Sequence, residues 1–543
     1  MADRAHRSHS VGPTFWRRST GPPPFAPDWV VAVGGGTGAG TEADPWSLAH
    51  ALSGAGGAIQ PGDTIGIHGG TYTQTAAWSV TVNGTAGVDD DDPDTKVKFR
   101  NFPGEFVSIT ATDALPNAVL TLDCSYVWFW STFEDGGGIE VWTNEDEDRS
   151  GFGNRASCVW YRNNPPQNGN KMIHVVARDG ANGIFTGNGA GSDHRHHIEL
   201  YGFISMNNGE DTSPRTHNMY VRHNSEGGTK TMRLTGCVLC NSVGHGIQIY
   251  PGSLTESVDD IQVDKMIGWG AGALGTATGG WTNYIISGGG ASSPVRRSWC
   301  RDSVFYHVGS GSNEKQCLIG STAGGVVSED DFFERNYVVG GGATPLIEIQ
   351  DHLVDGNPSL TFDDNEIIVH TDAGEVTRFD QSGSLVNFSS VANNAWKGRT
   401  PTATAWDHGG TNKTFATCMT DIGWDAAGNT AVAALPTVNK AIVHVLTKYN
   451  PYAHVAIFNW EGGANVAVDL SSFLGNGDEY EVHHFYDYVP GSGFGTPLLS
   501  GTYAGGTVNF PTAAHTPPAP VGTTPRLAPD NDTLFNAFLV VKR

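Results

Sequence analysis

The sequence predicts an all-β protein: a right-handed parallel β-helix followed by a small antiparallel β-sandwich. Two observations support this prediction, a strand pattern that recurs roughly every 30 residues and a composition rich in turn residues. Of the 543 residues, 72 are glycine and 38% are hydrophobic, whereas only 16% are charged. This balance is typical of turn-rich β architecture with a buried core.

The repeat consists of two strand series that run together from about residue 170 onward. Positions that follow the first strand of each unit are separated by 34, 29, 37, 33 and 29 residues: Phe203, Cys237, Met266, Ser303, Asn336 and Asn365. Inward pairs of the second strand are separated by 28, 37, 33 and 30 residues and begin at Met219, Ile247, Tyr284, Cys317 and Ile347. A unit of this length cannot bury its apolar row alone. We therefore expect successive coils to stack and to form backbone hydrogen bonds along a common axis.

The chain divides into four expected parts. An extended, basic and Pro-rich arm covers residues 1–30, the β-helix covers 31–400, a linker covers 401–440, and the sandwich covers 441–543. The last part is assigned because its apolar and polar residues alternate between turns rich in Gly, Asn and Asp.

Composition also limits the partners. The net charge of −24 repels nucleic acid and anionic membranes, so we expect neither as a partner. No apolar stretch approaches the length of a membrane span. Seven cysteines, an odd number that falls mostly inside strand patterns, indicate buried thiols and argue against a disulfide framework.

The N-terminal arm has basic residues but no apolar h-region, so no secretory signal peptide is visible. A polar, Pro-rich segment of this kind is normally disordered in isolation. We therefore expect residues 1–30 to be held by an assembly partner.

Three segments resemble the opening coils of pectate-lyase-like right-handed β-helix proteins, which include the chondroitinase B and alginate lyase group and phage tailspikes. They are GGGTGAGTEADPWSLAHAL with PGDTIGIHGGTYT (residues 34–73), KVKFRNFPGEFVSIT (96–110) and SYVWFWSTFE (125–134). The resemblance implies that a short helix over Pro45–Leu52 caps the stack and that residues 63–68 form the first coil strand. It also implies a polysaccharide ligand and leaves open a homotrimer, as in many β-helix spikes. The C-terminal region resembles the small β-sandwich of many glycoside hydrolases.

The densest polar segments, residues 193–223 and 226–250, supply the candidate site. Glycan hydrolysis requires paired carboxylates, whereas lyase chemistry requires a base beside a group, often Ca²⁺, that neutralises a uronate. The candidate catalytic residues are Glu210, Asp211, His217, Arg222 and His245. The candidate glycan-binding residues are Arg215, Tyr220, His223, Lys230, Gln248 and Tyr250. In the repeat register His217 and His245 lie on neighbouring coils, within one coil spacing of each other.

Other motifs are less specific. Gly244-His245-Gly246 resembles one motif of the polygalacturonases, but their paired aspartates and Arg-x-Lys are not found at matching positions. No metal ligand set is assigned, and Ca²⁺ stays open as a cofactor. The run Asp89–Asp92 is expected to be a solvated acidic turn.

Two functions are compatible with these observations. The first is a spike or appendage protein, on a virion or an extracellular surface, that presents a β-helix face to a surface polysaccharide. The absent signal peptide and the incomplete catalytic set favour it. The alternative is a polysaccharide lyase or glycoside hydrolase acting on an acidic glycan.

Overall fold

The computed structural model describes residues 25–74, 78–111, 118–143, 156–162, 167–187, 197–210, 216–224, 231–251, 256–274, 281–288, 293–307, 315–320, 328–341, 344–350, 360–370, 374–379, 388–424, 427–521 and 533–543. Of the N-terminal arm, residues 1–24 therefore lie outside the described part of the chain.

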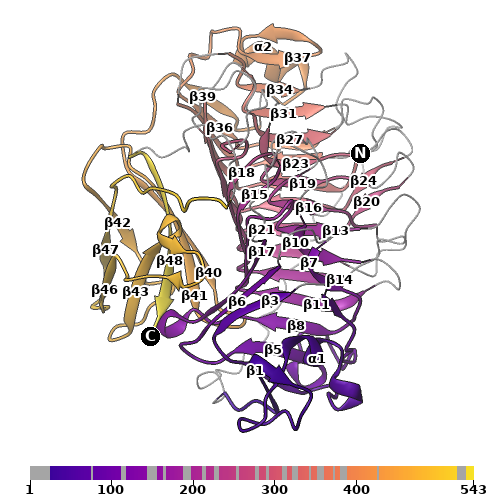
Figure 1. Ribbon diagram of the computed structural model, residues 1–543. Coiled ribbons are helices and arrows are strands. Elements are labelled where there is room, and N and C mark those ends of the chain that lie inside the picture. Colours follow the sequence, from indigo (N-terminus) through magenta and orange to yellow (C-terminus); the bar gives the residue numbers. More distant parts are fainter. Residues whose placement is uncertain are drawn as a thin grey trace.

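The larger part of the molecule is a parallel β-helix, as the repeat predicts (Figure 1). Its coils stack so that each adds a strand to three long sheets, each of which has 12 strands in the described part of the chain. We name them sheets 1, 2 and 3 in the order in which the chain visits them. All neighbouring strands pair parallel except the last two of sheet 3, which are antiparallel.

The strand bounds follow the order of each sheet. Sheet 1 comprises β1 (Trp29–Gly36), β2 (Thr64–Ile67), β5 (Val97–Asn101), β8 (Val127–Trp130), β11 (Asn168–Ile173), β14 (His197–Tyr201), β17 (Met232–Thr235), β21 (Ile261–Asp264), β25 (Trp299–Arg301), β29 (Asp331–Glu334), β32 (Leu360–Asp363) and β35 (Phe388–Ala392). Sheet 2 comprises β3 (Gly70–Gln74), β6 (Phe106–Ala111), β9 (Gly138–Thr143), β12 (Val176–Arg178), β15 (Ile204–Asn208), β18 (Val238–Ser242), β22 (Ile267–Trp269), β26 (Val304–His307), β30 (Tyr337–Gly340), β33 (Glu366–Val369), β36 (Ala395–Lys397) and β39 (Thr430–Val432). Sheet 3 comprises β4 (Trp78–Val80), β7 (Ala118–Leu122), β10 (Ser157–Tyr161), β13 (Ile184–Thr186), β16 (Met219–Val221), β19 (Ile247–Ile249), β23 (Thr282–Ile286), β27 (Lys315–Gly320), β31 (Ile347–Gln350), β34 (Thr377–Phe379), β37 (Trp406–His408) and β38 (Thr411–Lys413). A small sheet between sheets 3 and 1 comprises β20 (Val258–Asp259), β24 (Val295–Arg296) and β28 (Ser328–Glu329).

The predicted register is confirmed. Met219 pairs with Ile247, Ile247 with Tyr284, and Tyr284 with Cys317, so the inward series of the second predicted strand is a ladder of sheet 3. The first predicted strand is a ladder of sheet 1 in the same way. These residues belong to the core that fills the inside of the coils.

The turn from sheet 1 to sheet 2 is short and constant. In the later coils it has two residues, of which the first adopts positive φ and the second points inward. The second position holds Asn336, Asn365 and Asn394. The side-chain oxygen of Asn365 accepts the Asn336 backbone N–H at 3.0 Å, and Asn394 does the same for Asn365. This asparagine ladder satisfies polar groups that would otherwise be buried without partners.

Both ends of the coil stack are covered. Helix α1 (Leu48–Leu52), whose N-terminus is capped by Ser47, buries Leu48 and Leu52 at the first end, as expected. Strand β1 precedes the strand that the sequence predicts as the first. Residues 401–440, expected as a linker, hold β37, β38, helix α2 (Phe415–Asp421) and β39, and these elements continue sheets 2 and 3. Short 3₁₀ turns lie at η1 (Ala55–Gly57), η2 (Pro93–Thr95), η3 (Glu134–Gly136) and η4 (Phe485–Asp487).

The C-terminal region is antiparallel, as predicted. Its main sheet has the order β40 (Lys440–Leu446), β41 (Tyr452–Phe458), β48 (Phe535–Lys542), β43 (Glu479–His484) and β46 (Leu499–Thr502). Two further pairs are β42 (Asn465–Asp469) with β47 (Thr507–Pro511) and β44 (Tyr488–Val489) with β45 (Gly493–Phe494). One face of the main sheet packs on a core of its own that includes Val466, Leu470 and Phe510.

The other face of the main sheet packs on the outer face of sheet 2, beside the stacked coils in Figure 1. Ile204, Val238 and Ile267 of sheet 2 meet Tyr452 and Phe458 of β41 in one buried cluster. Sheet 2 is therefore apolar on both faces, and this explains near-continuous apolar runs such as YVVG in β30. Because sheet 2 is covered, its outer face is closed to ligands.

All seven cysteines are buried free thiols, as the sequence indicates. In the part of the chain that the structure describes, no helix has the length and apolar character needed to cross a membrane.

Candidate functional site

One row of side chains runs along the outer face of sheet 3, with one residue on each coil. Strand register places them next to one another in the order Trp160, Phe185, Tyr220, Gln248, Ile285, Leu318, Glu348, Arg378 and Asp407. They alternate with inward residues such as Val159 and Ile184, which lie in the core. Neighbouring coils are about 4.8 Å apart, which is close to the length of one sugar ring in an extended polysaccharide.

The first three residues of this row form an aromatic platform. The rings of Trp160 and Phe185 are 6.1 Å apart, and those of Phe185 and Tyr220 are 5.5 Å apart. Trp160 and Phe185 are partly exposed. Aromatic side chains with one free face and a polar edge are suited to sugar stacking.

Two arginines border this platform. The Arg222 guanidinium lies 5.5 Å from the Phe185 ring and 4.9 Å from the Tyr220 ring, and it donates to the Tyr220 hydroxyl at 3.3 Å. Arg162 lies 5.8 Å from the Trp160 ring, and 49% of its side chain is exposed. On a strongly acidic protein, these cations supply a local site for carboxylate or sulfate groups.

His217 and His245 do come together on neighbouring coils, as predicted, with ring centroids 4.9 Å apart. The His217 Nδ1 accepts the backbone N–H of His245 at 3.0 Å, and the His245 Nδ1 accepts that of Thr282 at 3.0 Å. In a neutral imidazole the proton then resides on Nε2, so neither ring offers a basic nitrogen to a ligand. Burial lowers the pKa of His217 far below its usual range. Burial, together with the charge of Lys315, lowers the pKa of His245 to about 3.

This geometry favours a positioning role for the histidine pair. The His217 ring lies parallel to that of Tyr220, with centroids 5.8 Å apart, and so supports the platform from behind. Sequence reasoning proposed the two histidines as catalytic. That catalytic role stays a prediction, and of the two rings it is His217 that packs on Tyr220.

The remaining predicted residues divide into two groups. Gln248 follows Tyr220 in the outward row, and Tyr250, also partly exposed, lies just after the same strand. Glu210 and His223 are buried, and the His223 Nδ1–H donates to the Asp259 carbonyl at 2.6 Å, which is a structural contact. Asp211, Arg215 and Lys230 lie outside the described residues.

Sequence reasoning missed Trp160, Phe185 and Arg162. The signal was present, because the inward series extends backward from Met219 to Ile184 and Val159. The residues that follow these two positions are Phe185 and Trp160.

The far end of the outward row is charged. Arg378 contacts Glu348 at 3.2 Å and Asp407 at 3.5 Å, so it lies between the two carboxylates. Lys315 is also paired with Glu348. Burial, and then the charge of Glu375, raise the pKa of Asp407. Glu348 is fully buried, so its ion pairs with Arg378 and Lys315 stabilise this end of sheet 3.

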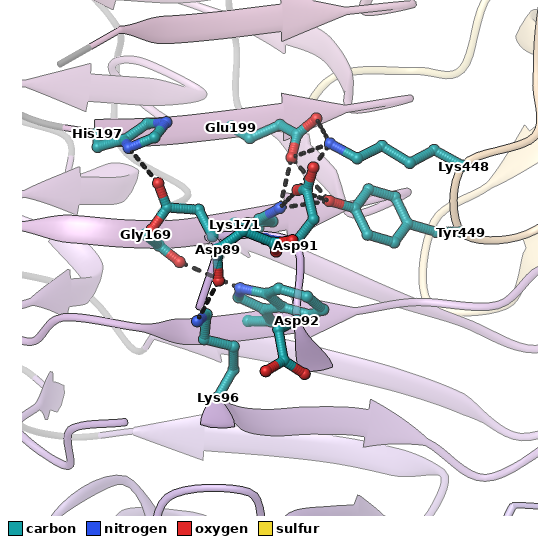
Figure 2. Close-up of polar contacts among 12 residues, drawn as sticks. Asp89, Asp91, Asp92, Lys96, Gly169, Lys171, His197, Glu199, Lys448 and Tyr449 are labelled. Carbon is teal, nitrogen blue, oxygen red and sulfur yellow. Dashed lines mark hydrogen bonds and ion pairs between the residues drawn. The ribbon is translucent and has the colours of Figure 1, made fainter. Parts of the chain in front are cut away.

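A second polar cluster lies on the outer face of sheet 1, where the C-terminal region reaches over the helix (Figure 2). Lys171 and Glu199 are neighbours on β11 and β14, and their Nζ and Oε2 atoms are 2.7 Å apart. Lys448, from the segment between β40 and β41, contacts Glu199 at 2.7 Å and Asp91 at 2.9 Å. The Tyr449 hydroxyl donates to Glu199 at 2.7 Å.

We name these five residues, Asp91, Lys171, Glu199, Lys448 and Tyr449, the domain lock. Burial raises the pKa of Glu199, but the charges of Lys171 and Lys448 outweigh it and lower that pKa overall. The Asp89–Asp92 run is a turn in which Asp89 and Asp91 are exposed, as expected, but two of its carboxylates are also paired with basic side chains. Asp91 is in the lock, and Asp90 pairs with His197 at 2.6 Å. The charged groups of the domain lock are paired with one another. The lock therefore joins the C-terminal region to the outer face of sheet 1.

Among the described residues, one set of three potential metal ligands comes together: His484, Asp487 and His515. The two imidazoles are stacked, with centroids 3.9 Å apart and planes within 7° of each other. The ligand atoms of the three residues lie within 4.8 Å of one another. A calcium ion prefers oxygen ligands, so a set with two imidazoles does not suit Ca²⁺, which stays open as a cofactor.

No family model and no curated protein sequence matches this chain. Solved structures show distant similarity. Pectate lyase Pel9A is 12% identical over 68% of this chain and 74% of its own, with a TM-score of 0.30. An alginate lyase from Paenibacillus sp. str. FPU-7 is 13% identical over 64% of this chain and 91% of its own, with a TM-score of 0.33. XylC in complex with xylose is 8% identical over 94% of this chain and 99% of its own, with a TM-score of 0.34.

Proposed function

We propose that this protein binds a polysaccharide along the outer face of sheet 3. The observation on which the proposal rests is the row Trp160, Phe185 and Tyr220, one aromatic side chain on each of three successive coils. A glycan that lies parallel to the helix axis meets one ring for each sugar or so, because coil spacing and sugar length are similar. Aromatic stacking of this kind is a common way to bind an apolar sugar face.

The charge of the site favours an acidic glycan. Arg162 and Arg222 both lie at the edge of the platform, and among the described residues the carboxylate in contact with Arg162 is that of Asp123, at a long 3.5 Å. A uronate carboxylate would therefore be held by a guanidinium while its ring stacks on the neighbouring aromatic side chain.

The test is binding of the full chain to immobilised polygalacturonate, alginate and a neutral glucan. We expect Trp160→Ala with Phe185→Ala to weaken binding to an acidic glycan by about 100-fold, since each lost stacking contact contributes about 1–2 kcal/mol. The matched control is Trp299→Ala with Phe332→Ala, a neighbouring pair on the outer face of sheet 1. Equal losses in both double variants, or no binding by the wild type, would refute the proposal.

Cleavage is the second candidate, because Arg222 and Tyr220 form a pair suited to β-elimination. In that reaction the guanidinium would neutralise the uronate carboxylate, and the Tyr220 oxygen, 3.3 Å away, would take the C5 proton. The C4–C5 double bond would form as the C4–O bond breaks, and the proton would pass to the departing oxygen. A lyase would leave an unsaturated sugar that absorbs ultraviolet light, whereas a hydrolase would leave new reducing ends without that absorbance. If Tyr220→Phe retains binding and loses either product, the platform is also an active site. Absence of both products from the wild type rejects the enzyme.

A further inference from the structure

A second concave site lies at the corner between sheets 1 and 2, away from sheet 3. It is a cavity of about 380 Å³ between the turns of four coils and strand β40. Its polar lining includes Lys265, Asp302, Arg335, Asp364, Glu366 and Lys440. Cavities of about 300–1,000 Å³ are the size class of small-ligand sites.

Four of these residues occupy the same turn position in successive coils. Lys265, Asp302, Arg335 and Asp364 have φ of 59°, 51°, 55° and 58°. Glycine is the residue best suited to this conformation, and two earlier coils have it there, Gly202 and Gly236. Lysine and arginine gain nothing from the backbone at such a position. Their side chains are used there: Lys265 donates to the Val445 carbonyl and Arg335 to Asp302.

The charges in this row alternate in sign along the axis. Positive Lys265, negative Asp302, positive Arg335 and negative Asp364 follow one another at coil spacing, about 4.8 Å. The Arg335 guanidinium is bonded to both Asp302 oxygens, at 2.8 and 2.9 Å, yet 47% of the Arg335 side chain and 43% of that of Asp302 stay exposed. The pair thus presents donors and acceptors side by side to the solvent.

The opposite wall of the cavity, formed by β40, also presents a cation beside a carboxylate. Lys440 of β40 lies 3.6 Å from Glu366 and 5.4 Å from the centre of the Tyr337 ring, with 46% of its side chain exposed. A polyanion or a polycation would meet as many like charges as opposite charges in this cavity. A neutral polyol would not, because each hydroxyl both donates to a carboxylate and accepts from a cation.

We propose that this cavity, the turn groove, is a second carbohydrate site that takes two or so sugar units of a neutral oligosaccharide. It is chemically distinct from the aromatic, cationic platform of sheet 3 and does not depend on it. A chain with both sites would hold an acidic polymer on one side and a neutral chain on another.

The positive φ of the row permits a variant that removes a side chain without straining the backbone. Arg335→Gly and Asp364→Gly should keep or raise the melting temperature, since glycine suits the turn. The control is Asn393→Gly, at the same turn position one coil beyond the groove, with φ of 56°.

The probes are cellohexaose, xylohexaose and maltohexaose, titrated calorimetrically into the full chain. We expect at least one to bind, with affinity reduced about tenfold or more by Arg335→Gly and by Asp364→Gly. Affinity should be unchanged in Asn393→Gly and in the Trp160→Ala, Phe185→Ala double variant. The proposal is overturned if none of the three hexasaccharides binds at millimolar concentration. It is also overturned if binding survives both groove variants or disappears with the sheet 3 variant.

Discussion

At the scale of single residues, Lys448 is the side chain that ties the C-terminal region to the outer face of sheet 1. It contacts Glu199, only 6% of whose side chain is exposed, and Asp91. Removing the ammonium leaves a buried carboxylate with Lys171 as its remaining cation.

We predict that Lys448→Met lowers the free energy of unfolding by about 1–3 kcal/mol, because a buried ionic partner is lost. Urea denaturation followed by fluorescence measures the change. The control is Lys542→Met, whose pair with Asp478 is more exposed, and it should cost at most about 0.5 kcal/mol. Equal costs would show that the domain lock is no stronger than a surface ion pair.

Residue-level prediction from sequence succeeded where a residue follows the repeat. Tyr220 and Gln248 lie directly after inward positions of the traced series, and both are in the outward row. The buried state of His217 and Glu210 was not predictable in this way, because it depends on contacts between coils. Lys448 and Tyr449 are more than 200 residues from their partner Glu199, a distance that no local pattern bridges.

At the scale of elements, buried histidines line the contact between the C-terminal sheet and the coil turns. His174 follows β11, whereas His444 and His454 face each other across β40 and β41. The His174 ring contacts the rings of Phe133, Tyr201 and Tyr452. His454 contacts Phe485, and the charges nearest His444 are Lys265 and Asp302.

Burial lowers the pKa of His444 to about 4 and that of His454 to about 3 from an ordinary 6.5, and it lowers the pKa of His174 as well. The unfolded chain therefore binds more protons than the folded one below pH 6.5. Stability is complete above that pH and falls as the pH drops toward the folded values.

We predict that His444 and His454 each cost about 2 kcal/mol of stability at pH 5 relative to pH 7. Thermal denaturation between these pH values measures the loss. His444→Leu with His454→Leu should reduce the loss, and the remainder comes from the other buried histidines, His174, His217 and His245. An unchanged profile in the double variant would place the acid sensitivity elsewhere.

Element-level prediction was strong for the coils and weak for their connections. Both predicted series are ladders of paired strands. They could be read from the sequence because the spacing of about 30 residues comes directly from the stacking of one coil on the next. The range 401–440 was expected as a linker because its strands β37 and β39 are short and not apolar enough to stand out. They are identified only by pairing with the previous coil.

At the scale of the whole molecule, the outer faces of the three sheets have different surroundings. Sheet 2 is covered by the C-terminal sheet through a shared apolar cluster, and sheet 1 supplies the domain lock. Sheet 3 is left with an aromatic and cationic outer row. The sequence predicts that one long face is offered to a glycan, but the choice of face follows from which sheets the C-terminal region covers.

The most direct test is hydroxyl-radical footprinting of the full chain with and without polygalacturonate or alginate. Aromatic side chains react readily, so the bound surface is read residue by residue. We predict that Trp160, Phe185 and Tyr220 become protected while Trp299 and Phe332 on sheet 1 keep their reactivity. Protection of Trp299 and Phe332, with Trp160 and Phe185 unchanged, would contradict the assignment of sheet 3 as the binding face.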